Sequence, residues 1–370
     1  MTAAIFFLPD LRAGGAQRGV VDVLAHWPAG PERPLLALGA RVGGGAGWLD
    51  AGIETVDLGA PRLRDAILKL RRLVAMRRPR VLVSTMPAAN VAAVVATSGL
   101  ADAPRHVLCE VNSHRLHDAL GWPLRRLLRW AYARAERVVA LSRGLAAELE
   151  SDYALPAGSV VAIPNPIDVE AWRRRAAAAT ASPWPPGPPV ILGAGRLVRQ
   201  KGFDVLLDAF DSVARRRPLR LVLIGEGPER PRLAAQARAL GVADAVTLAG
   251  HADDPAGWFR HCALFVLSSR WEGFGNVVAE AMACGAPVIA TRCPHGPDEI
   301  VADGVTGRLV APENAEALAS AIVACLDDPA GSAARAAAGA ADVERFAALR
   351  VAARWATLLE RIGEDRRDGA

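Results

Sequence analysis

The stretch RWEGFGNVVAEAMACGAPVIAT, residues 270–291, combines a glycine-rich loop, a helix and a strand in one short segment. After the loop, a helical pattern begins at Asn276 and stops at Gly285, a residue type suited to the position just past a helix end. An apolar run typical of a buried strand follows, and another apolar run at 264–267 precedes the loop. A strand, a loop, a helix and a second strand in this order predict one unit of a parallel α/β sheet.

The same alternation of apolar runs and helical patterns recurs along the whole chain of 370 residues. Strands linked by helices favour parallel sheets of the doubly wound type. A chain of this length is sufficient for about two domains. We expect strands at residues 4–8, 81–84, 107–109, 138–141, 190–192, 219–224, 245–248, 264–267 and 288–290.

A proline-rich segment divides the chain into two halves. Residues 180–190, TASPWPPGPPV, contain five prolines and one glycine, a composition typical of extended linkers. We therefore expect, in chain order, an N-terminal domain at 1–170, a linker at 171–189, a C-terminal domain at 190–342, a helix at 343–362 that packs back on the N-terminal domain, and a charged tail at 363–370.

Composition narrows the class of protein. The formal net charge of +5 arises in the first half, because residues 1–168 hold 20 Arg or Lys and 15 Asp or Glu, whereas residues 169–370 hold 24 of each. A basic half indicates an anionic neighbour such as a membrane surface, a nucleic acid or a phosphate, or else a solvated surface with no partner.

The five cysteines are scattered without zinc spacing, which favours a reduced compartment. We expect no signal peptide and no membrane-spanning helix, since no apolar run reaches ~18 residues.

Two acids, Glu272 and Glu280, flank the glycine loop and the first turn of the helix that follows it. In open α/β sheets ligands bind beyond the carboxyl ends of the strands, and the free N–H groups of a helix N-terminus favour phosphate. Glu280 lies one turn after Asn276, where a carboxylate could accept hydrogen bonds from a ribose diol. Glu272 lies ahead of the phosphates, where a sugar would be. Taken alone, this spacing also fits a surface loop and a capped amphipathic helix.

A second loop supports the anion-binding interpretation. The sequence GAGRLVRQKGFD, residues 193–204, places Arg196 and Lys201 between an expected strand and an expected helix. The chain has 44 Arg and Lys residues, but only Lys69 and Lys201 are lysines. A lysine in a glycine-flanked loop of so arginine-rich a chain indicates selection for a compact charge, which suits a diphosphate that also receives an arginine. Ordinary surface charges beside a helix are the alternative.

With both loops in view, the chain resembles the retaining glycosyltransferases of the GT-B fold, family 4 type. The segments LIGEGPERPRL (223–233), LAGHADD (248–254) and IPNPID (163–168) match in place as well. The resemblance implies two Rossmann-like, doubly wound domains with a nucleotide-sugar donor in the cleft. It implies a catalytic or sugar-positioning role for Glu272, and donor-binding roles for Arg196, Lys201, Gly225, Arg230, His251, Phe274, Gly275, Asn276, Val277 and Glu280.

The first half resembles the family less closely. DLRAGGAQR, residues 10–18, is similar to the family's N-terminal glycine loop, so Gly14 and Gly15 are expected to face the donor phosphates, although Gln17 replaces the usual acid. VLCEVNSHR, residues 107–115, occupies the place of the acceptor-side residues. Its candidates are Glu110 and His114 for catalysis and Asn112 for the acceptor, although the family's His-Asp pair is absent here.

The resemblance implies metal-independent transfer of a sugar, from a UDP-sugar in the first instance, to a hydroxyl group with retention of configuration. No Asp-x-Asp metal motif occurs, and no cofactor is expected. RCPHGPDEI, residues 292–300, is similar to transferases that build bacterial surface polysaccharides and lipid-linked oligosaccharides. A nucleotide-sugar epimerase on the same fold stays open as an alternative. A nucleic-acid-binding module is disfavoured by an aromatic content of 5% and by the lack of a recognised motif.

Two arginine-rich helical patterns in the first half bear on location. Residues 62–78 and 122–137 each combine an apolar face with clustered arginines. In the second pattern we expect the apolar face to include Leu127, with Arg125, Arg126 and Arg129 off it. Both helices could simply pack on the sheet with solvated arginines. The alternative is a cytoplasmic enzyme held on the anionic inner leaflet of the plasma membrane, where a lipid-linked acceptor would be met.

Overall fold

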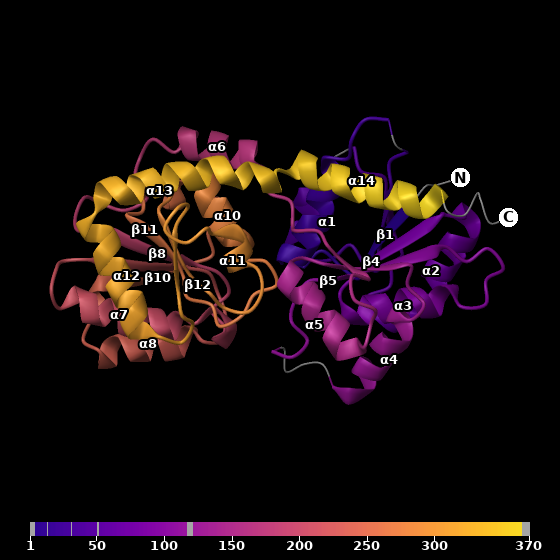
Figure 1. Cartoon of the computed structure of the whole chain (residues 1–370), viewed down its shortest axis with the longest axis horizontal. Coiled ribbons are helices and arrows are strands. Elements are labelled where there is room, and N and C mark those ends of the chain that lie inside the picture. Colours follow the sequence, from indigo (N-terminus) through magenta and orange to yellow (C-terminus); the bar gives the residue numbers. More distant parts are fainter. Residues whose placement is uncertain (1–3, 13, 31, 50–51, 117–120, 365–370) are drawn as a thin grey trace. The chain divides into compact units, whose positions relative to one another are not determined.

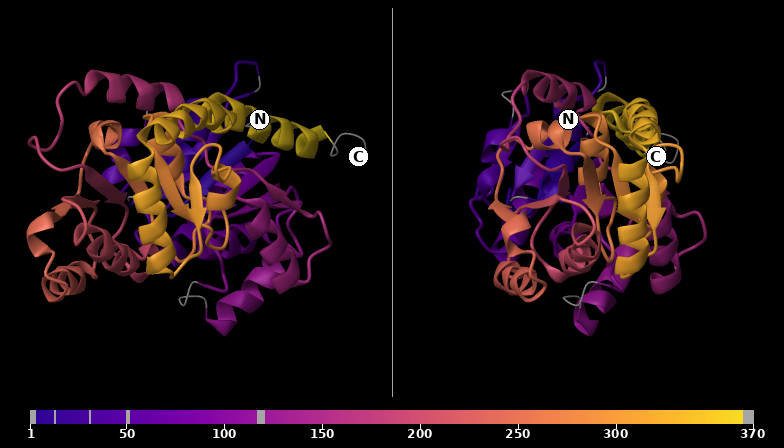
Figure 2. Two further views of the ribbon diagram at one scale, coloured as in Figure 1. Left: turned by 60° about the vertical axis from the view of Figure 1, so that its left-hand side comes forward. Right: turned by 90° about the vertical axis from the view of Figure 1, so that its left-hand side faces the viewer.

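The computed structural model describes residues 4–12, 14–30, 32–49, 52–116 and 121–364. The chain forms two compact units, each built on one parallel sheet. Unit 1 comprises Met1–Ile167 and Phe346–Ala370, and unit 2 comprises Asp168–Arg345. Figures 1 and 2 show the strands of each unit enclosed by helices on both faces. This arrangement confirms the predicted fold class of two doubly wound α/β domains.

The sheet of unit 1 has seven parallel strands in the order β3-β2-β1-β4-β5-β6-β7. Its central strands are almost wholly apolar because both faces of a parallel sheet are covered by helices. All five residues of β1, AIFFL, are buried. The strands are β1 (Ala4–Leu8), β2 (Leu35–Leu38), β3 (Thr55–Asp57), β4 (Val81–Thr85), β5 (Arg105–Glu110), β6 (Arg137–Ala140) and β7 (Val160–Ala162).

Helices cover both faces of this sheet. On the face of Phe7, α2 (Leu63–Arg77), α3 (Pro87–Thr97) and α4 (Trp122–Tyr132) pack side by side, with α3 in the middle. On the face of Phe6, α1 (Gly15–Ala25) packs against α14 (Ala348–Glu364), whose Trp355 meets the Phe6 ring edge-on at 5.7 Å. The remaining elements are α5 (Arg143–Tyr153) and the 3-10 turn η1 (Gly44–Trp48).

The sheet of unit 2 has six parallel strands in the order β10-β9-β8-β11-β12-β13. Strand order reverses between β8 and β11, and an open α/β sheet holds its ligands beyond the carboxyl ends at such a point. The strands are β8 (Val190–Ala194), β9 (Arg220–Ile224), β10 (Val246–Gly250), β11 (Leu264–Leu267), β12 (Val288–Thr291) and β13 (Arg308–Val310).

Two helix layers enclose this sheet as well. One layer packs through a core around Phe210, and the other meets the strands through Phe259 and Phe265, whose rings lie 5.3 Å apart. The first layer contains α7 (Phe203–Ala214), α8 (Arg230–Ala239) and α12 (Ala315–Asp327), and the second contains α6 (Val169–Ala178), α9 (Ala256–His261) and α10 (Asn276–Ala283). Unit 2 also contains α11 (Pro297–Ile300), α13 (Pro329–Asp342) and the 3-10 turns η2 (Arg199–Lys201) and η3 (Ala243–Ala245), and η4 (Val343–Phe346) leads into α14.

The structure adds detail that the sequence patterns did not contain. Strands β2, β3, β7 and β13 were not anticipated. Residues 169–178 of the segment expected as a linker form α6, which belongs to unit 2, and the C-terminal helix α14 belongs to unit 1. Residues 365–370 of the expected tail lie outside the described residues. Within the described part of the chain, no helix combines the length and apolar character needed to cross a bilayer.

Candidate functional site

The loops that follow neighbouring strands of unit 2 are joined by backbone hydrogen bonds. The loop after β8 meets the loop after β9 where the N–H of Leu197 donates to the carbonyl oxygen of Glu226 at 2.8 Å. The loop after β11 meets the loop after β8 where the N–H of Arg270 donates to the carbonyl oxygen of Gln200 at 2.7 Å. These bonds hold both glycine loops at one edge of the sheet, the edge at which parallel α/β sheets bind ligands.

A glycine is essential to this close approach. Gly202 has φ of +62°, and a Cβ atom there would lie 2.1 Å from the carbonyl oxygen of Ser268. The hydroxyl of Ser268 in turn donates to the carbonyl oxygen of Lys201 at 2.8 Å. Because any side chain at position 202 would force the loops apart, the contact depends on this residue type.

Lys201 and Glu272 are ion-paired where the two loops meet. Nζ of Lys201 lies 2.6 Å from Oε1 of Glu272, and the hydroxyl of Ser269 donates to the same oxygen at 2.6 Å. The side chains of the pair are only 14% and 7% exposed. With so little solvent around them, both charges are held in fixed positions at the edge of the sheet. A diphosphate and a sugar hydroxyl arriving there would each find an oriented charged group.

Arg270 fastens the same two loops together, a role that the sequence analysis missed. Its guanidinium donates to both carboxylate oxygens of Asp204 at 2.9 Å, to the carbonyl oxygen of Arg199 at 2.8 Å and to Glu313 at 2.9 Å. The Arg270 side chain is 12% exposed. The fork geometry of arginine suits this bidentate pair. In the sequence, Arg270 stands at the start of the stretch 270–291 and Asp204 at the end of the stretch 193–204, and nothing else there indicates that they pair.

The electrostatics of this pair favour its charged state. Burial by itself would raise the pKa of Asp204, but the hydrogen bonds and charge of Arg270 outweigh burial and lower that pKa below its ordinary value. Hydrogen bonds to Asp204 correspondingly raise the pKa of Arg270, against the opposing effect of burial. The two loops are therefore held by an ionised pair at neutral pH.

The N-terminus of α10 lies directly after the Glu272 loop. Its N-cap Gly275 has φ of +98°, a left-handed conformation that favours glycine. Phe274 is buried, whereas Asn276, Val277 and Glu280 are half-buried. Free backbone N–H groups in the first helical turn favour an anion, and Glu280 follows one turn later.

The remaining residues assigned to the donor lie at the strand ends of the same unit. Gly225 follows β9 with φ of +135°, and a Cβ atom there would lie 1.9 Å from the carbonyl oxygen of Gly195. Arg196 is exposed, and Arg230 donates to the carbonyl oxygen of Leu248 at 2.8 Å. His251 has a side chain that is 73% exposed and lies 3.5 Å from Asp253. Their donor-binding roles stay predictions.

In unit 1, Gly14 and Gly15 lie where α1 begins, beyond the carboxyl end of β1. Both are exposed. Gly14 has an extended backbone, and a Cβ atom there would lie 2.8 Å from the side-chain oxygen of Gln17. The glycine loop therefore precedes a helix N-terminus, the arrangement that suits phosphate, although contact with the donor stays a prediction.

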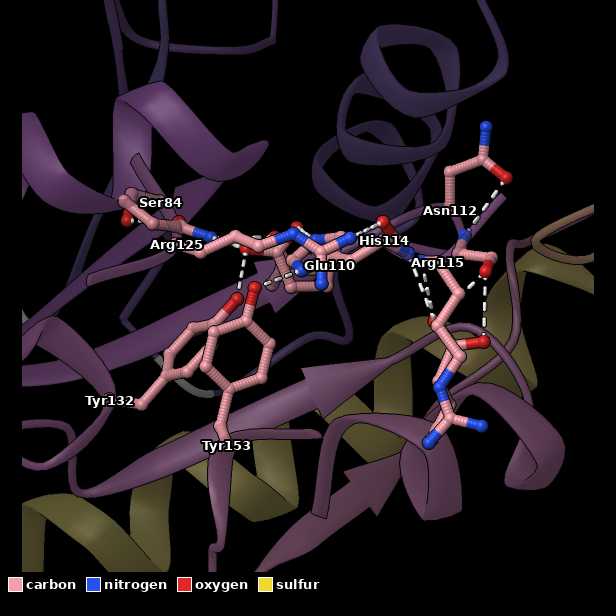
Figure 3. Close-up of polar contacts among 12 residues, drawn as sticks. Ser84, Glu110, Asn112, His114, Arg115, Arg125, Tyr132 and Tyr153 are labelled. Atoms are coloured by element: carbon pink, nitrogen blue, oxygen red, sulfur yellow. Dashed lines mark hydrogen bonds and ion pairs between the residues drawn. The ribbon is translucent and has the colours of Figure 1, made fainter. Parts of the chain in front are cut away.

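Glu110 and His114 meet inside unit 1 (Figure 3). Glu110 ends β5, is 0% exposed, and accepts hydrogen bonds from the hydroxyl of Tyr132 at 2.6 Å and the side-chain amide of Asn90 at 2.7 Å. Nε2 of His114 lies 3.1 Å from the other Glu110 oxygen, and Nδ1 lies 2.7 Å from the hydroxyl of Tyr153. Since a carboxylate accepts, Nε2 of His114 donates to Glu110.

This network is closed to solvent. His114 is 1% exposed and Glu110 is 0% exposed, so neither of these two catalytic candidates presents an atom to a substrate in this conformation. Burial and the charge of Glu110 raise the pKa values of both Tyr132 and Tyr153, which therefore stay protonated donors. The arrangement suits residues that position a loop, and direct catalysis by Glu110 or His114 stays a prediction.

The loop that follows β5 is held on two sides. The carboxylate of Glu148 accepts from the hydroxyl of Ser113 at 2.8 Å and from the backbone N–H of His114 at 2.9 Å. Arg125 of α4 donates to the carbonyl oxygen of His114. Asn112, the acceptor-side candidate, is half-buried at the start of this loop. A rigid loop of this kind can orient a polar side chain toward a ligand.

Met86, next to this loop, has an unusual backbone conformation. It follows β4 with φ of +84° and ψ of 146°, a region that L-residues rarely adopt, and its N–H donates to the carbonyl oxygen of Cys109 at 3.1 Å. Such strained residues cluster at functional sites. No local pattern in the sequence marks Met86.

Among the described residues, no cluster of three or more His, Cys, Asp or Glu side chains could hold a metal ion.

The two sheets, their strand orders and the loops at their carboxyl edges define a GT-B architecture of two Rossmann-like domains. Residues 11–171 match the family model described as Glycosyltransferase Family 4, and residues 188–328 match the model described as Glycosyl transferases group 1. The chain therefore contains one domain of each of these two glycosyltransferase families.

Curated relatives of known name align with part of the chain. The lipopolysaccharide core biosynthesis glycosyltransferase LpsE of Rhizobium meliloti is 41% identical over 138 residues, which cover 37% of this chain and 39% of that protein. The N-acetylgalactosamine-N,N'-diacetylbacillosaminyl-diphospho-undecaprenol 4-alpha-N-acetylgalactosaminyltransferase of Campylobacter jejuni is 27% identical over 202 residues, covering 55% of this chain and 54% of that protein. The chain spans about half the length of the curated relatives it matches, or less.

Solved structures share the fold over nearly the full length. The structure of Anabaena HepE in complex with UDP has a TM-score of 0.79 at 22% identity and covers 97% of this chain and 100% of that one. Sucrose-phosphate synthase from Thermosynechococcus elongatus has a TM-score of 0.82 at 21% identity and covers 97% of this chain and 99% of that one. At this level of identity, the likeness establishes the fold.

Proposed function

We propose that the protein transfers a sugar from a nucleotide diphosphate donor, a UDP-sugar in the first instance, to a hydroxyl group with retention of configuration. The observation that carries this proposal is the Lys201–Glu272 ion pair between two glycine loops at the ends of adjacent strands. A diphosphate needs a cation and a sugar needs hydrogen-bond acceptors, and the pair offers both. The UDP bound to HepE, which has the same fold, supports uridine diphosphate as the first donor to test.

The difficult part of such a reaction is the departure of the nucleoside diphosphate. Negative charge develops on its phosphates as the bond to the sugar breaks. In our proposal Arg196, Lys201 and the N-terminus of α10 at Asn276 stabilise this charge, and no metal ion or other cofactor takes part. Removing one such preorganised group costs about 10²–10³-fold in kcat in well-studied enzymes.

The two acids take different roles in this scheme. Glu280, one turn into α10, accepts hydrogen bonds from the ribose hydroxyls and so contributes to donor affinity. Glu272 gives up its contact with Lys201, which turns to the diphosphate, and accepts hydrogen bonds from hydroxyls of the transferred sugar. Glu272 is thus a positioning group for the sugar, and its effect is largest in the transition state.

We further propose a lipid-linked glycan as the acceptor, met at the inner leaflet of the plasma membrane during synthesis of cell-envelope polysaccharide or glycolipid. The support is the likeness to LpsE and to the undecaprenol-linked transferase of Campylobacter jejuni. The acceptor-side residue in this proposal is Asn112, held by the loop that Glu148 and Arg125 fix in place.

A donor-hydrolysis screen with UDP-, GDP- and ADP-sugars tests the function. We expect slow release of a nucleoside diphosphate from one donor class, and product formation with the same anomeric configuration by NMR once an acceptor is supplied. Isomerisation of the donor sugar without release of diphosphate would instead indicate an epimerase. If no donor is consumed under any condition, the transferase proposal is wrong.

Calorimetry with UDP and with uridine tests the assignment of Lys201. We expect Lys201→Ala to weaken UDP binding about 10-fold or more, because one charge-assisted contact of ~1.5–3 kcal/mol is lost, and to leave uridine binding nearly unchanged. Lys69→Ala is the matched control, since it removes the other lysine of the chain. Equal losses for UDP and uridine would place Lys201 away from the phosphates.

A further inference from the structure

Three neighbouring helices of unit 1 expose an unusual share of large apolar side chains. In the described part of the chain, eight large hydrophobic residues are exposed, and five of them lie on α2, α3 and α4. Because α3 packs between α2 and α4, the three helices form one continuous layer, hereafter the α2–α4 layer (Figure 1). The five exposed residues are Leu68, Met76, Val95, Trp122 and Leu127.

The exposure of these side chains places them on the outer side of the layer. On α2, Leu68 and Met76 are 65% and 72% exposed and lie two turns apart, with the exposed Arg72 between them. On α4, Trp122 is 68% exposed and Leu127 is 47% exposed. The sequence pattern assigned Leu127 to the apolar face with Leu128 and Ala131, but Leu127 is exposed whereas those two residues are buried. Apolar side chains gathered on one surface indicate an interaction site.

The same layer has a net charge of 8 − 1 = +7, which is larger than the net charge of the whole chain. Helices α2, α3 and α4 together contain eight Arg or Lys residues and one acid, Asp65, whereas the whole chain has a net charge of only +5. An acid outside the three helices, Asp102, is exposed in the turn after α3. The exposed basic residues of the three helices are Arg64, Lys69, Arg72, Arg126 and Arg129.

Indole rings and guanidinium groups are paired on α4 and just beyond it. The guanidinium carbon of Arg126 lies 5.0 Å from the ring centroid of Trp122, and that of Arg134 lies 4.7 Å from the ring centroid of Trp130. Such pairs are apolar on one side and cationic on the other. Groups with this double character are enriched where a protein meets the boundary between lipid headgroups and acyl chains.

We propose that the α2–α4 layer is a docking surface for an anionic lipid bilayer. A bilayer receives scattered apolar side chains and arginines at the same time, because acyl chains lie directly beneath a layer of phosphates. A single-stranded nucleic acid fits less well, since it needs aromatic stacking platforms and the aliphatic Leu68, Met76 and Val95 offer none. Trp122 and Leu127 enter the headgroup region, and Arg126 and Arg129 contact lipid phosphates.

The docking helix is joined to the acceptor-side loop. Arg125 of α4 is half-buried and donates to the carbonyl oxygen of His114, so it is not one of the solvated arginines that the sequence pattern suggested. Docking of α4 therefore brings the loop of Asn112 to the membrane. In this respect the inference rests on the proposed lipid-linked acceptor, whereas the docking itself does not depend on it.

Co-sedimentation of the full-length protein with vesicles tests the proposal. We expect binding to vesicles of phosphatidylglycerol and phosphatidylcholine at low salt and weaker binding to phosphatidylcholine alone. As salt screens the charges, binding should weaken to the part that apolar insertion supports. The triple variant Arg126→Glu, Arg129→Glu, Arg134→Glu should bind at least about 100-fold more weakly, because each arginine near an anionic surface contributes about five-fold in affinity.

Two further variants separate charge from apolar insertion. Trp122→Ser with Leu127→Ser should lose the part of the binding that survives at high salt. The matched control reverses the charge of three exposed arginines of unit 2, with the substitutions Arg216→Glu, Arg238→Glu and Arg260→Glu. It changes the net charge of the protein by the same amount as the triple variant, but its affinity for vesicles should stay within about three-fold of the wild type.

Several outcomes would overturn the proposal. The wild type failing to bind anionic vesicles at low salt would do so, as would equal losses in the triple variant and its control. Binding to single-stranded RNA without binding to vesicles would assign the surface to nucleic acid instead. Donor hydrolysis by the same variants keeps the two proposals apart, since a failed donor screen with intact vesicle binding refutes only the proposed function.

Discussion

The ion pair between Arg270 and Asp204 offers a sharp test of how the two glycine loops of unit 2 are held together. Arg270→Ala removes a fork that makes two hydrogen bonds to Asp204 and one to the carbonyl oxygen of Arg199. The Asp204 carboxylate, whose side chain is 19% exposed, then keeps a longer ion pair with Arg232 at 3.6 Å. Breaking a buried ion pair costs 3–5 kcal/mol, and the partial exposure here reduces the expected loss to about 3 kcal/mol.

The expected change is measurable in two ways. The Tm of unit 2 should fall by about 6–12 °C, since a loss of 1 kcal/mol in the free energy of unfolding lowers Tm by roughly 2–4 °C in a unit of this size. Affinity for UDP should fall as well, because Lys201 and Glu272 lie on the two loops that Arg270 joins. Arg270→Lys keeps the charge but loses the fork, so we expect about half the effect.

Matched variants make the test specific. Arg232→Ala removes an arginine that also approaches Asp204 but is 60% exposed, and it should cost less than about 1 kcal/mol. In a double-mutant cycle with Asp204→Asn, the two changes should be non-additive by about 2 kcal/mol. An Arg270→Ala protein that unfolds within 1 °C of the wild type and binds UDP normally would refute the reasoning.

Three further predictions concern single residues. Glu280→Gln should raise the KM for the donor and Glu272→Gln should lower kcat, both measured by steady-state kinetics, and wild-type values for both would remove them from the site. Burial lowers the pKa of His106 to about 4. Between pH 6.5 and pH 4, the unfolded chain therefore binds a proton at this histidine that the folded protein does not bind. The free energy of unfolding should therefore fall as pH drops from 6.5 to 4, by about 2.5 kcal/mol at pH 4.5. Urea titrations of His106→Asn should lack that part of the pH dependence, and identical pH profiles for the variant and the wild type would contradict this. Tyr132→Phe should destabilise unit 1 by about 1–3 kcal/mol in urea unfolding, because Glu110 loses a buried donor, and an unchanged midpoint would show that the network does not hold the fold.

The sequence by itself determined the fold class and the placement of the two glycine loops of unit 2 after their strands. Apolar runs separated by helical patterns carry a local signal, and parallel order then puts the ends of β8 and β11 at the same edge. The sequence placed the loops of Lys201 and Glu272 each after an expected strand, and the carboxyl ends of parallel strands meet at one edge of a sheet. The sequence could not show that the side chains of these two residues are ion-paired.

The tertiary structure alone decided the contacts between segments that are far apart in the chain. Arg270 and Asp204 are 66 residues apart, and either residue alone reads as an ordinary surface charge. Likewise, burial of Glu110 and His114 depends on Tyr132 and Tyr153, which come from other elements of the fold. Apolar runs predict buried strands, but the burial of polar residues such as Glu110 and His114 depends on packing between distant segments, and no local pattern encodes it.

The short edge strands and the exposed face of α4 also could not be predicted from the local sequence pattern. Strands β3, β7 and β13 have three residues each, too few for a periodic signal, and they form because a neighbouring strand offers unpaired backbone groups. Leu127 fits the apolar side of a helical pattern, yet Leu128 and Ala131 fill the available core and leave Leu127 in solvent. A helix presents more apolar side chains than its neighbours can cover, and only the neighbours decide which of them stay outside.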